Sequence, residues 1–209
     1  MKMKILIATT NPGKKAEFAA MLGGRMNVEW VGLDDFGDIE EVQEDGQTFA
    51  ENARKKALGY SKATGCITVA DDSGLCIDAL DGQPGVNSAR FSGPKLPDEQ
   101  RTLIDHRNIA KVLEMLKDVP DEDRSARFVC SLCVASPKKI LLETEGTMEG
   151  AIIREEQGTG GFGYDPIMYI PSHGKTVAQL SSAQKNFISH RGNAIRKLKP
   201  LLADLISKL

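Results

Sequence analysis

The stretch KILIATTNPGKKAEFAAML, residues 4–22, decides how the chain begins to fold. The segment Lys4–Ala8 is apolar after its first residue, which predicts a buried strand. Pro12 suits the first position of a helix, and the apolar residues between Phe18 and Leu22 follow helical spacing. The chain is therefore expected to open with a strand, a tight polar loop and a helix over 12–22.

Helices and strands continue to alternate after this opening. Thr48 and Glu51 have the spacing of a capping box, which predicts a helix that ends near Gly65. Apolar patterns predict strands over Cys66–Ala70, Leu75–Leu80, Arg127–Ala135, Ile140–Glu145 and Gly150–Arg154, and helices over Asp98–Lys117 and Arg191–Leu209. This order favours one α/β domain over residues 1–209, built on a mixed sheet flanked by helices. Two lobes around a central cleft are expected.

The composition is that of a globular protein and argues against several classes of function. Of the 209 residues, 41% are hydrophobic and 27% are charged. The formal net charge is -2, so no overall field draws the protein to nucleic acid or to an anionic membrane. The apolar run at the N-terminus ends at Thr9, too early for a secretory signal, and no transmembrane segment follows. The expected location is the cytoplasm.

The cysteines are expected to be reduced thiols, as in most cytoplasmic proteins. Cys130 and Cys133 form a CxxC pattern within a predicted strand. Their odd spacing sends the two side chains to opposite faces of a sheet. Packing in the core is therefore favoured over a redox or zinc site.

A polar loop links the first strand to the first helix and has the features of a phosphate site. Amides and the positive dipole end at a helix N-terminus favour an oxyanion, and Lys14 adds a cation. The loop is not a P-loop, because Ala8 and Lys15 stand where that pattern needs glycine and a hydroxyl residue. An asparagine cap beside two solvated lysines explains the loop equally well. The candidate phosphate-binding residues are Thr9, Thr10, Asn11, Pro12, Gly13 and Lys14.

Two adjacent carboxylates, Asp71 and Asp72, follow a predicted apolar strand. At the end of a strand they would lie at the edge of the sheet, where carboxylates can hold a hard cation and orient water. A simple turn is the alternative, but a turn needs no acid pair after a buried strand. Glu44, in an acidic stretch, is a second candidate metal ligand. Lys56 shares a helix face with Asn52 and is either a phosphate ligand or a solvated lysine.

Two later segments carry groups suited to a flat ligand. The glycine-rich loop 158–163 formally matches a dinucleotide fingerprint, but no helix is predicted to start there, which argues against a Rossmann fold. Its backbone allows a close approach and presents aromatic side chains for stacking. Lys185, His190 and Arg191 offer hydrogen-bond donors near the start of the last helix, where solvated charges are the alternative.

With these motifs, the sequence resembles the inosine triphosphate pyrophosphatase family over nearly the whole chain. The resemblance rests on segments TNPGK (10–14), TFAENA (48–53), ADDSGL (70–75), PGVNSAR (84–90), GTGGFGYDP (158–166) and ISHRG (188–192). It implies an elongated α/β fold with a long twisted mixed sheet, a homodimer and Mg²⁺ as cofactor. It also implies cleavage of a nucleoside triphosphate to the monophosphate and pyrophosphate.

The resemblance further implies roles for particular residues. Asp72 would be the catalytic base and a metal ligand, with Glu44 as the second ligand, although Gln43 stands where some members have a further acid. The implied substrate contacts are Thr9, Thr10, Asn11, Pro12, Gly13, Lys14 and Lys56 at the phosphates, Ser73, and Phe162, Gly163, Tyr164, Asp165, Lys185, His190 and Arg191 at the base.

The function expected from the sequence is therefore hydrolysis of deaminated purine nucleotides, ITP, dITP and XTP, by a Mg²⁺-dependent pyrophosphatase. The expected partner is this small molecule rather than a nucleic acid or a membrane. Two alternatives stay open: a pyrophosphatase for pyrimidine or other modified nucleotides, and a nucleotide sensor without catalysis. The implied base-pocket residues argue against the first. The adjacent acids argue against the second, because a pure anion binder gains nothing from carboxylates without a metal.

Overall fold

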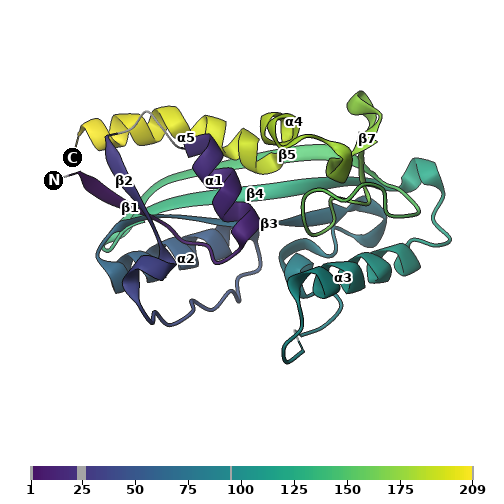
Figure 1. Ribbon diagram of the computed structural model, residues 1–209, viewed down its shortest axis with the longest axis horizontal. Helices are drawn as coiled ribbons and strands as arrows, with labels where there is room; N and C mark the ends of the chain where they lie inside the picture. Colours follow the sequence, from purple (N-terminus) through teal and green to yellow (C-terminus); the bar gives the residue numbers. More distant parts are fainter. Residues whose placement is uncertain (1, 23–26, 95, 209) are drawn as a thin grey trace. The chain divides into compact units, whose positions relative to one another are not determined.

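A seven-stranded mixed sheet carries the fold (Figure 1). The computed structural model describes residues 2–22, 27–94 and 96–208. The strands are β1 (Met3–Ile7), β2 (Val28–Gly32), β3 (Ile67–Ile77), β4 (Ser125–Ser136), β5 (Lys139–Ile152), β6 (Met168–Ile170) and β7 (Lys175–Thr176). Their order is β2-β1-β3-β4-β5-β6-β7, with β1 parallel to β2 and β3, and β6 antiparallel to β5 and β7. The predicted α/β class and mixed sheet are confirmed.

The helices begin and end largely where local signals predict. They are α1 (Pro12–Leu22), α2 (Phe49–Thr64), α3 (Arg101–Met115), α4 (Ser182–Ile188) and α5 (His190–Ser207). Short 3-10 helices cover Leu33–Phe36, Asp78–Leu80, Gly85–Arg90, Asp121–Asp123, Pro171–His173 and Val177–Gln179. The Thr48 hydroxyl caps α2 by accepting a hydrogen bond from the Glu51 amide at 3.1 Å. Leu209, the end of the predicted last helix, lies outside the described residues.

The chain divides into two compact units. The first comprises Met1–Asp72, Cys130–Gly146 and His190–Leu209, and the second comprises Ser73–Val129 and Thr147–Ser189. Strands β3, β4 and β5 contribute residues to both units. The single domain over residues 1–209 and the central cleft stay predictions.

The first unit has a separate core on each face of its strands. Ile5 of β1 belongs to a cluster with Phe18 of α1 and Ile195 of α5, whereas the next residue, Leu6, belongs to a cluster with Ala57 of α2. Successive side chains of a strand point to opposite faces. Helices α1 and α5 therefore cover one face of this part of the sheet, and α2 covers the other (Figure 1).

Gly146 lets β5 approach the first turn of α5 closely. A Cβ atom at this position would lie 2.3 Å from the His190 carbonyl oxygen and 2.4 Å from the Ala194 amide nitrogen. Both neighbours are backbone atoms, so they cannot move aside as the end of a flexible side chain can. Glycine at position 146 therefore allows the first turn of α5, which carries His190 and Arg191, to pack directly against β5.

The second unit has its own hydrophobic cluster. Leu75 and Ile77 of β3 pack there with Ile109 and Val112 of α3. The two residues of β3 are two positions apart and so share one face of the strand, and the two residues of α3 are three apart and share one face of the helix. This packing holds α3 against the sheet.

Two predicted breaks between strands are absent from the described residues. β3 runs without interruption through Asp71 and Asp72, so the expectation that these acids follow the end of a strand is wrong. Asp, Ser and Gly favour turns locally, but almost all of β3 is buried, and sheet pairing outweighs that preference. The pairing of β1 with β3 ends at Val69, so the acids lie just beyond the end of β1. β5 likewise joins two predicted strands in one.

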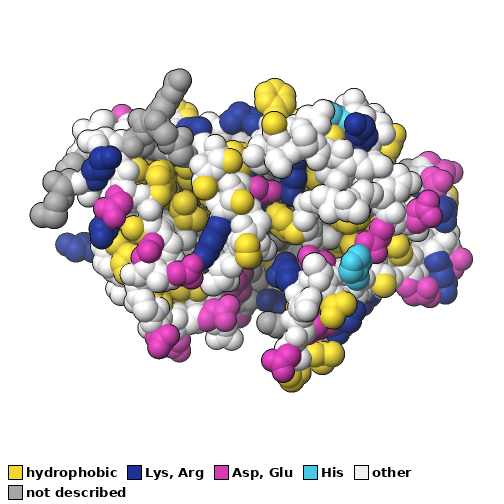
Figure 2. Space-filling view, viewed as in Figure 1, with side chains coloured by type: hydrophobic (Ala, Val, Ile, Leu, Met, Phe, Trp, Pro, Cys, Tyr) yellow, Lys and Arg dark blue, Asp and Glu magenta, His cyan; other side chains and the backbone are white. Residues whose placement is uncertain are grey.

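The surface agrees with the balanced charge of the sequence. On the face drawn in Figure 2, basic and acidic side chains of the described residues are interspersed. Within the same residues, no helix combines the length and the apolar character needed to cross a membrane.

Candidate active site

The neighbouring acids of β3 face different helices. Asp71 is two residues after Val69, which packs against α1 and α5, and Asp72 is two residues after Ala70, which packs against α2. The alternation of a strand therefore directs the two carboxylates to opposite faces of the sheet. Each carboxylate has its own set of partners.

Asp71 lies at the middle of a buried row of alternating charges. Its Oδ2 atom is 2.8 Å from Lys14 Nζ and 3.0 Å from Arg191 Nη2, and Arg191 Nη1 also pairs with Glu17. The side chains of Asp71 and Arg191 are each 1% exposed. Burial acts to raise the pKa of Asp71, but the charges of Lys14 and Arg191 outweigh burial and hold this pKa far below its usual value. Asp71 is therefore ionised and fixes the Lys14 ammonium.

Asp72 is held by two residues one turn apart on α2. Asn52 Nδ2 donates a hydrogen bond to Asp72 Oδ2 at 3.0 Å, and Lys56 Nζ lies 3.6 Å from Oδ1. Lys56 Nζ also pairs with Glu44 Oε2 at 2.9 Å. Burial raises the pKa of Asp72, the Lys56 charge opposes this, and the nearby Glu44 charge adds to it, so the pKa is raised overall. A raised pKa suits a general base, because a general base works best when its pKa lies near neutrality.

Lys56 is a cation shared by two acids. Burial acts to lower its pKa, but the carboxylates of Asp71 and Asp72, with Glu44, outweigh burial and raise it. Lys56 therefore stays charged at neutral pH. Glu44 and Asp72 thus both face the Lys56 ammonium, and their role as metal ligands stays a prediction. The described residues contain no group of three or more His, Cys, Asp or Glu placed to hold a metal, so any such ion would need ligands from substrate or water as well.

The loop before α1 forms hydrogen bonds within itself. Asn11 Oδ1 accepts hydrogen bonds from the amides of Gly13 at 2.9 Å and Lys14 at 3.2 Å. In the structure described these two amides bond to Asn11, as the asparagine-cap interpretation expects, and the phosphate-binding roles of this loop stay predictions. Thr9 Oγ1 accepts from the Asn11 amide at 3.2 Å and orders the same loop.

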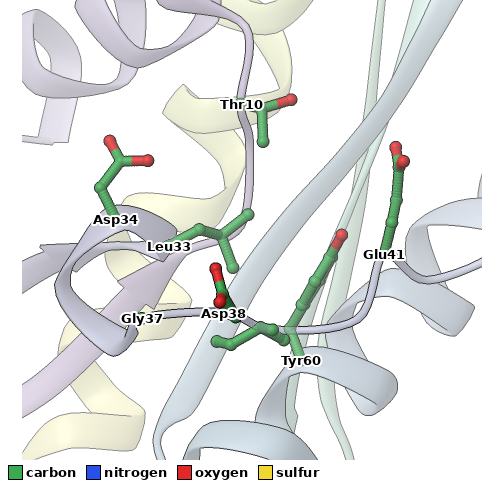
Figure 3. Close-up of a pocket in the computed structure, with 8 residues that line it drawn as sticks. Thr10, Leu33, Asp34, Gly37, Asp38, Glu41 and Tyr60 are labelled. Carbon is green, nitrogen blue, oxygen red and sulfur yellow. The ribbon is translucent and has the colours of Figure 1, made fainter.

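A pocket of about 330 Å³ is lined in part by Thr10. Figure 3 shows Thr10 on the loop after β1, Leu33 and Asp34 on the segment after β2, and Tyr60 on α2. The lining residues are Thr10, Leu33, Asp34, Gly37, Asp38, Ile39, Glu41 and Tyr60. These lining residues include acids but no lysine or arginine, whereas Lys14 and Lys56 accompany the acids of β3 and offset their repulsion of an anion. Charge therefore favours the lysine-bearing cluster over this pocket as the phosphate site.

The aromatic loop of the second unit is ordered around Asp165. Asp165 Oδ2 accepts hydrogen bonds from Lys185 Nζ at 2.7 Å and from the Phe162 amide at 2.9 Å. Lys185 Nζ also lies 4.3 Å from the centroid of the Phe162 ring, within the range of a cation–π contact. The structure thus brings Phe162, Asp165 and Lys185 together, as the resemblance implies.

The neighbours of Asp165 are tied to α3 and to the segment after β3. The Gly163 amide donates to Asp105 Oδ2 at 2.9 Å, and the Tyr164 hydroxyl donates to the Ser88 carbonyl at 2.8 Å. Tyr164 is buried, and burial raises its pKa, so its protonated hydroxyl can hold the loop through this bond, while its place in the base pocket stays a prediction. The partly exposed ring of Phe162 is the better surface for stacking.

The remaining candidates lie in different units. His190 and Arg191 are buried at the start of α5 in the first unit, and Ser73 is the first residue of the second unit and is partly exposed. The Arg191 guanidinium holds Asp71 and Glu17. These contacts favour a role in supporting the acids, and its place in a base pocket stays a prediction.

The CxxC pattern is a pair of core residues. Cys130 packs in the cluster beneath α1 and α5, and Cys133 packs in the cluster beneath α2. Both are free thiols. The expected opposite orientation is confirmed.

Glu17, which pairs with Arg191, and Asn52, which donates to Asp72, are not proposed as site residues from the sequence, where Asn52 is noted only as a neighbour of Lys56. Glu17 is three positions after Lys14 on α1, and Asn52 is four positions before Lys56 on α2. Residues three and four apart share a helix face. That spacing is the signal that identifies both from the sequence.

The family of the chain follows from its match over residues 5–201 to the Ham1 family. The chain belongs to the Ham1 family. This Ham1 chain is 46% identical to a dITP/XTP pyrophosphatase of Desulforamulus reducens over 203 residues, which cover 97% of each chain. It is 49% identical to a dITP/XTP pyrophosphatase of Geobacillus kaustophilus, with 97% of this chain and 96% of the relative covered.

Solved structures of Ham1 proteins have the same fold as this Ham1 chain. The Staphylococcus aureus Ham1 protein matches with a TM-score of 0.82 and 39% identity, over 95% of this chain and 97% of the other. A HAM1 protein from Coxiella burnetii matches with a TM-score of 0.85 and 40% identity, over 97% and 99% of the two chains. The family resemblance found in the sequence is confirmed.

Proposed function

We propose that this protein hydrolyses the deaminated purine nucleotides ITP, dITP and XTP to the nucleoside monophosphate and pyrophosphate. Relatives that carry the name dITP/XTP pyrophosphatase, at 46% and 49% identity over nearly the full chain, support this substrate class. The observation that carries the chemistry is the shared contact of Lys56 with Glu44 and Asp72, close to the Lys14–Asp71 pair. Carboxylates that can hold a metal ion and lysines that can bind phosphates lie side by side there, and phosphoryl hydrolysis needs both.

The acids fit a magnesium ion. Glu44 and Asp72 are oxygen donors that already face one cation, the Lys56 ammonium, and carboxylate oxygens are the protein ligands that Mg²⁺ prefers. When bound, Mg²⁺ would neutralise part of the triphosphate charge and polarise the phosphoryl group. Glu44 and Asp72 would hold it.

Asp72 would orient a water molecule for in-line attack at the α-phosphorus and accept its proton. The raised pKa of its buried carboxyl makes Asp72 a stronger base than an exposed aspartate. Asn52 would keep the carboxylate in one orientation through its hydrogen bond to Oδ2. Positioning of this kind supplies a large part of the barrier lowering in such reactions.

Lys14 and Lys56 would bind the phosphates, with Thr9, Thr10 and Asn11 beside them. A triphosphate carries about four negative charges at neutral pH, and each lysine offsets about one, so two lysines need the help of a metal. Asp71 would hold the Lys14 ammonium in place, since the two groups are 2.8 Å apart.

Phe162 and Lys185 would recognise the base. The ring would stack on the purine, and the ammonium would donate a hydrogen bond to the 6-oxo group that hypoxanthine and xanthine share. Adenine has an amino donor at that position, so the Lys185 N–H that faces the base would lose its acceptor, at a cost of roughly 1 to 3 kcal/mol, while Asp165 still held the ammonium. The homodimer and the cytoplasmic location implied by the sequence stay predictions.

The test is the product of ITP hydrolysis followed by phosphorus NMR. Attack at the α-phosphorus gives inosine monophosphate and pyrophosphate, with no inosine diphosphate released. Inosine diphosphate with orthophosphate would mean attack at the terminal phosphorus and would refute the mechanism. A panel of purine and pyrimidine triphosphates, measured with the same enzyme, separates this function from the alternatives: equal rates would reject base recognition, and binding without turnover would identify a sensor.

A further inference from the structure

Asn52 connects two parts of the candidate metal site. The Asn52 Nδ2 atom donates to Asp72 Oδ2 at 3.0 Å, and Oδ1 accepts from the Gly46 amide at 2.8 Å. The residue is 1% exposed. A carboxylate only accepts and an amide N–H only donates, so both neighbours require the same orientation of the side-chain amide.

Gly46 follows Glu44 by two residues, so this contact anchors the segment that carries the second acid. A Cβ atom at Gly46 would lie 2.6 Å from Asn52 Oδ1 and 2.9 Å from Glu51 Cβ. The segment approaches α2 this closely only because residue 46 is glycine. The hydrogen bond and the missing side chain together set the distance between the segment and the helix.

Lys56 completes the arrangement one helical turn later. Its ammonium contacts Glu44 Oε2 at 2.9 Å and Asp72 Oδ1 at 3.6 Å, whereas Asn52 holds the other oxygen of Asp72. Asn52 is neutral, so it holds Oδ2 of Asp72 without adding a second positive charge next to the carboxylate. Oδ1 stays available to a cation. The face of α2 that carries both residues thus orients both acids.

We propose that Asn52 is a positioning residue that sets the mutual placement of Glu44 and Asp72, so that both carboxylates can ligate one divalent cation. This inference rests on the proposed function. Two carboxylates repel each other when they approach without a cation, and a hydrogen-bonded anchor opposes their separation. Groups behind metal ligands commonly change metal affinity or activity by about 10- to 100-fold when they are removed.

The test compares three variants by direct titration with Mn²⁺, followed by the electron paramagnetic resonance signal of the free ion. Asn52→Ala removes both contacts, and Gly46→Ala forces the segment away from Asn52 without removing the amide. Glu51→Ala is the matched control, because Glu51 accepts from the Gln47 amide at 2.7 Å and so anchors the same segment beside Gly46. Circular dichroism verifies that each variant is folded.

We expect Asn52→Ala and Gly46→Ala to weaken Mn²⁺ binding about tenfold or more, and Glu51→Ala to change it less than threefold. The Mg²⁺ concentration that half-saturates XTP hydrolysis should rise in parallel, while KM for XTP at saturating Mg²⁺ stays nearly constant. Gly46→Ala keeps the test decisive if Asn52→Ala does not fold.

Equal Mn²⁺ affinity of wild type and the folded variants would overturn the inference. An equal loss in Glu51→Ala would also overturn it, because general anchoring of the segment would then explain the effect. Failure of the proposed function has a different signature: the wild type would bind Mn²⁺ and turn over none of the triphosphates.

Discussion

Asp71 and Asp72 are consecutive in β3, yet the pKa of Asp71 is lowered and the pKa of Asp72 is raised. Both carboxyl groups are buried, and burial raises the pKa of each. Asp71 has Lys14 and Arg191 on its face of the sheet, and these cations outweigh burial. Asp72 shares one lysine with Glu44. Environments that separate two carboxylates in this way separate their tasks, so we assign Asp71 to structure and Asp72 to catalysis.

Replacing Asp72 by asparagine should abolish most turnover without unfolding the protein. The amide keeps the shape of the side chain but loses the proton acceptor and the anionic ligand. We expect kcat for XTP to fall about a hundredfold or more at saturating Mg²⁺. Asp45→Asn is the control, since Asp45 is an exposed acid paired with Lys55. Unchanged kcat in Asp72→Asn would refute the assignment of the base.

Replacing Asp71 by asparagine should instead lower the free energy of unfolding. The Lys14 and Arg191 charges would lose their shared partner in a buried site, which typically costs about 3 to 5 kcal/mol. Urea unfolding at pH 7 measures this loss. Asp34→Asn, at an exposed acid paired with Lys15, should cost little. A deficit no larger than that of the control would contradict a structural role for Asp71.

The deficit of Asp71→Asn should also depend on pH. The pKa of Asp71 is lower in the folded than in the unfolded protein, so its stabilising effect is fully present above the unfolded value of about 3.9. The effect is lost as pH falls from there toward the folded pKa. Unfolding of wild type and variant compared at pH 7, 5, 4 and 3 should therefore show a gap that narrows only below about pH 4. If the difference in unfolding free energy between wild type and Asp71→Asn did not change with pH, the lowered pKa of Asp71 could not be its cause.

Lys185 should determine the preference for 6-oxo purines. Lys185→Met keeps an apolar chain of similar length and removes the donor. We expect the ratio of kcat/KM for ITP to that for ATP to fall about tenfold or more, since one mismatch is worth roughly 1 to 3 kcal/mol. Lys111→Met is the matched control, because Lys111 also lies over a phenylalanine ring, that of Phe91 at 4.4 Å. An unchanged ratio in Lys185→Met would show that another group reads the base.

The thiols of Cys130 and Cys133 should be inert in the native protein. Burial raises the pKa of each to about 12, so only about one in ten thousand is a thiolate at pH 8. Iodoacetamide should modify the partly exposed Cys66 and Cys76 before it modifies the buried Cys130 or Cys133. Mass spectrometry of the labelled native protein measures the order. Early labelling of Cys130 would contradict its place in the core.

Local sequence signals predicted where helices and strands form better than they predicted where a strand is broken. The bounds of α1 follow from Pro12 and the apolar spacing after it, and the start of α2 follows from Thr48. The turn preference of the residues after Asp72 is equally local, but the sheet overrides it, and β3 continues. Strand β2 has the same length as β1, but its sequence VEWVG contains a glutamate and ends in glycine, so it lacks the continuous apolar run that predicted β1.

The candidate site shows the same limit. Lys14 and Asp72 lie in recognisable motifs, and Lys56 and Glu44 have a suitable charge, so all four could be selected from the sequence. The pairing of Arg191 with Glu17 joins residues 174 positions apart, and no local signal encodes it. It depends on α1 and α5 covering the same face of the sheet, which only the assembled fold determines.

The asparagine cap of α1 has a consequence for how substrate is received. Because Asn11 already satisfies the amides of Gly13 and Lys14, the first turn of the helix is complete without an anion. Under the proposed function, the triphosphate would therefore meet a helix start whose amides already have a partner, and its binding would not depend on supplying one. Under the proposed function, pyrophosphate would likewise leave without removing a hydrogen-bond partner from the first turn, because Asn11 would keep both amides bonded.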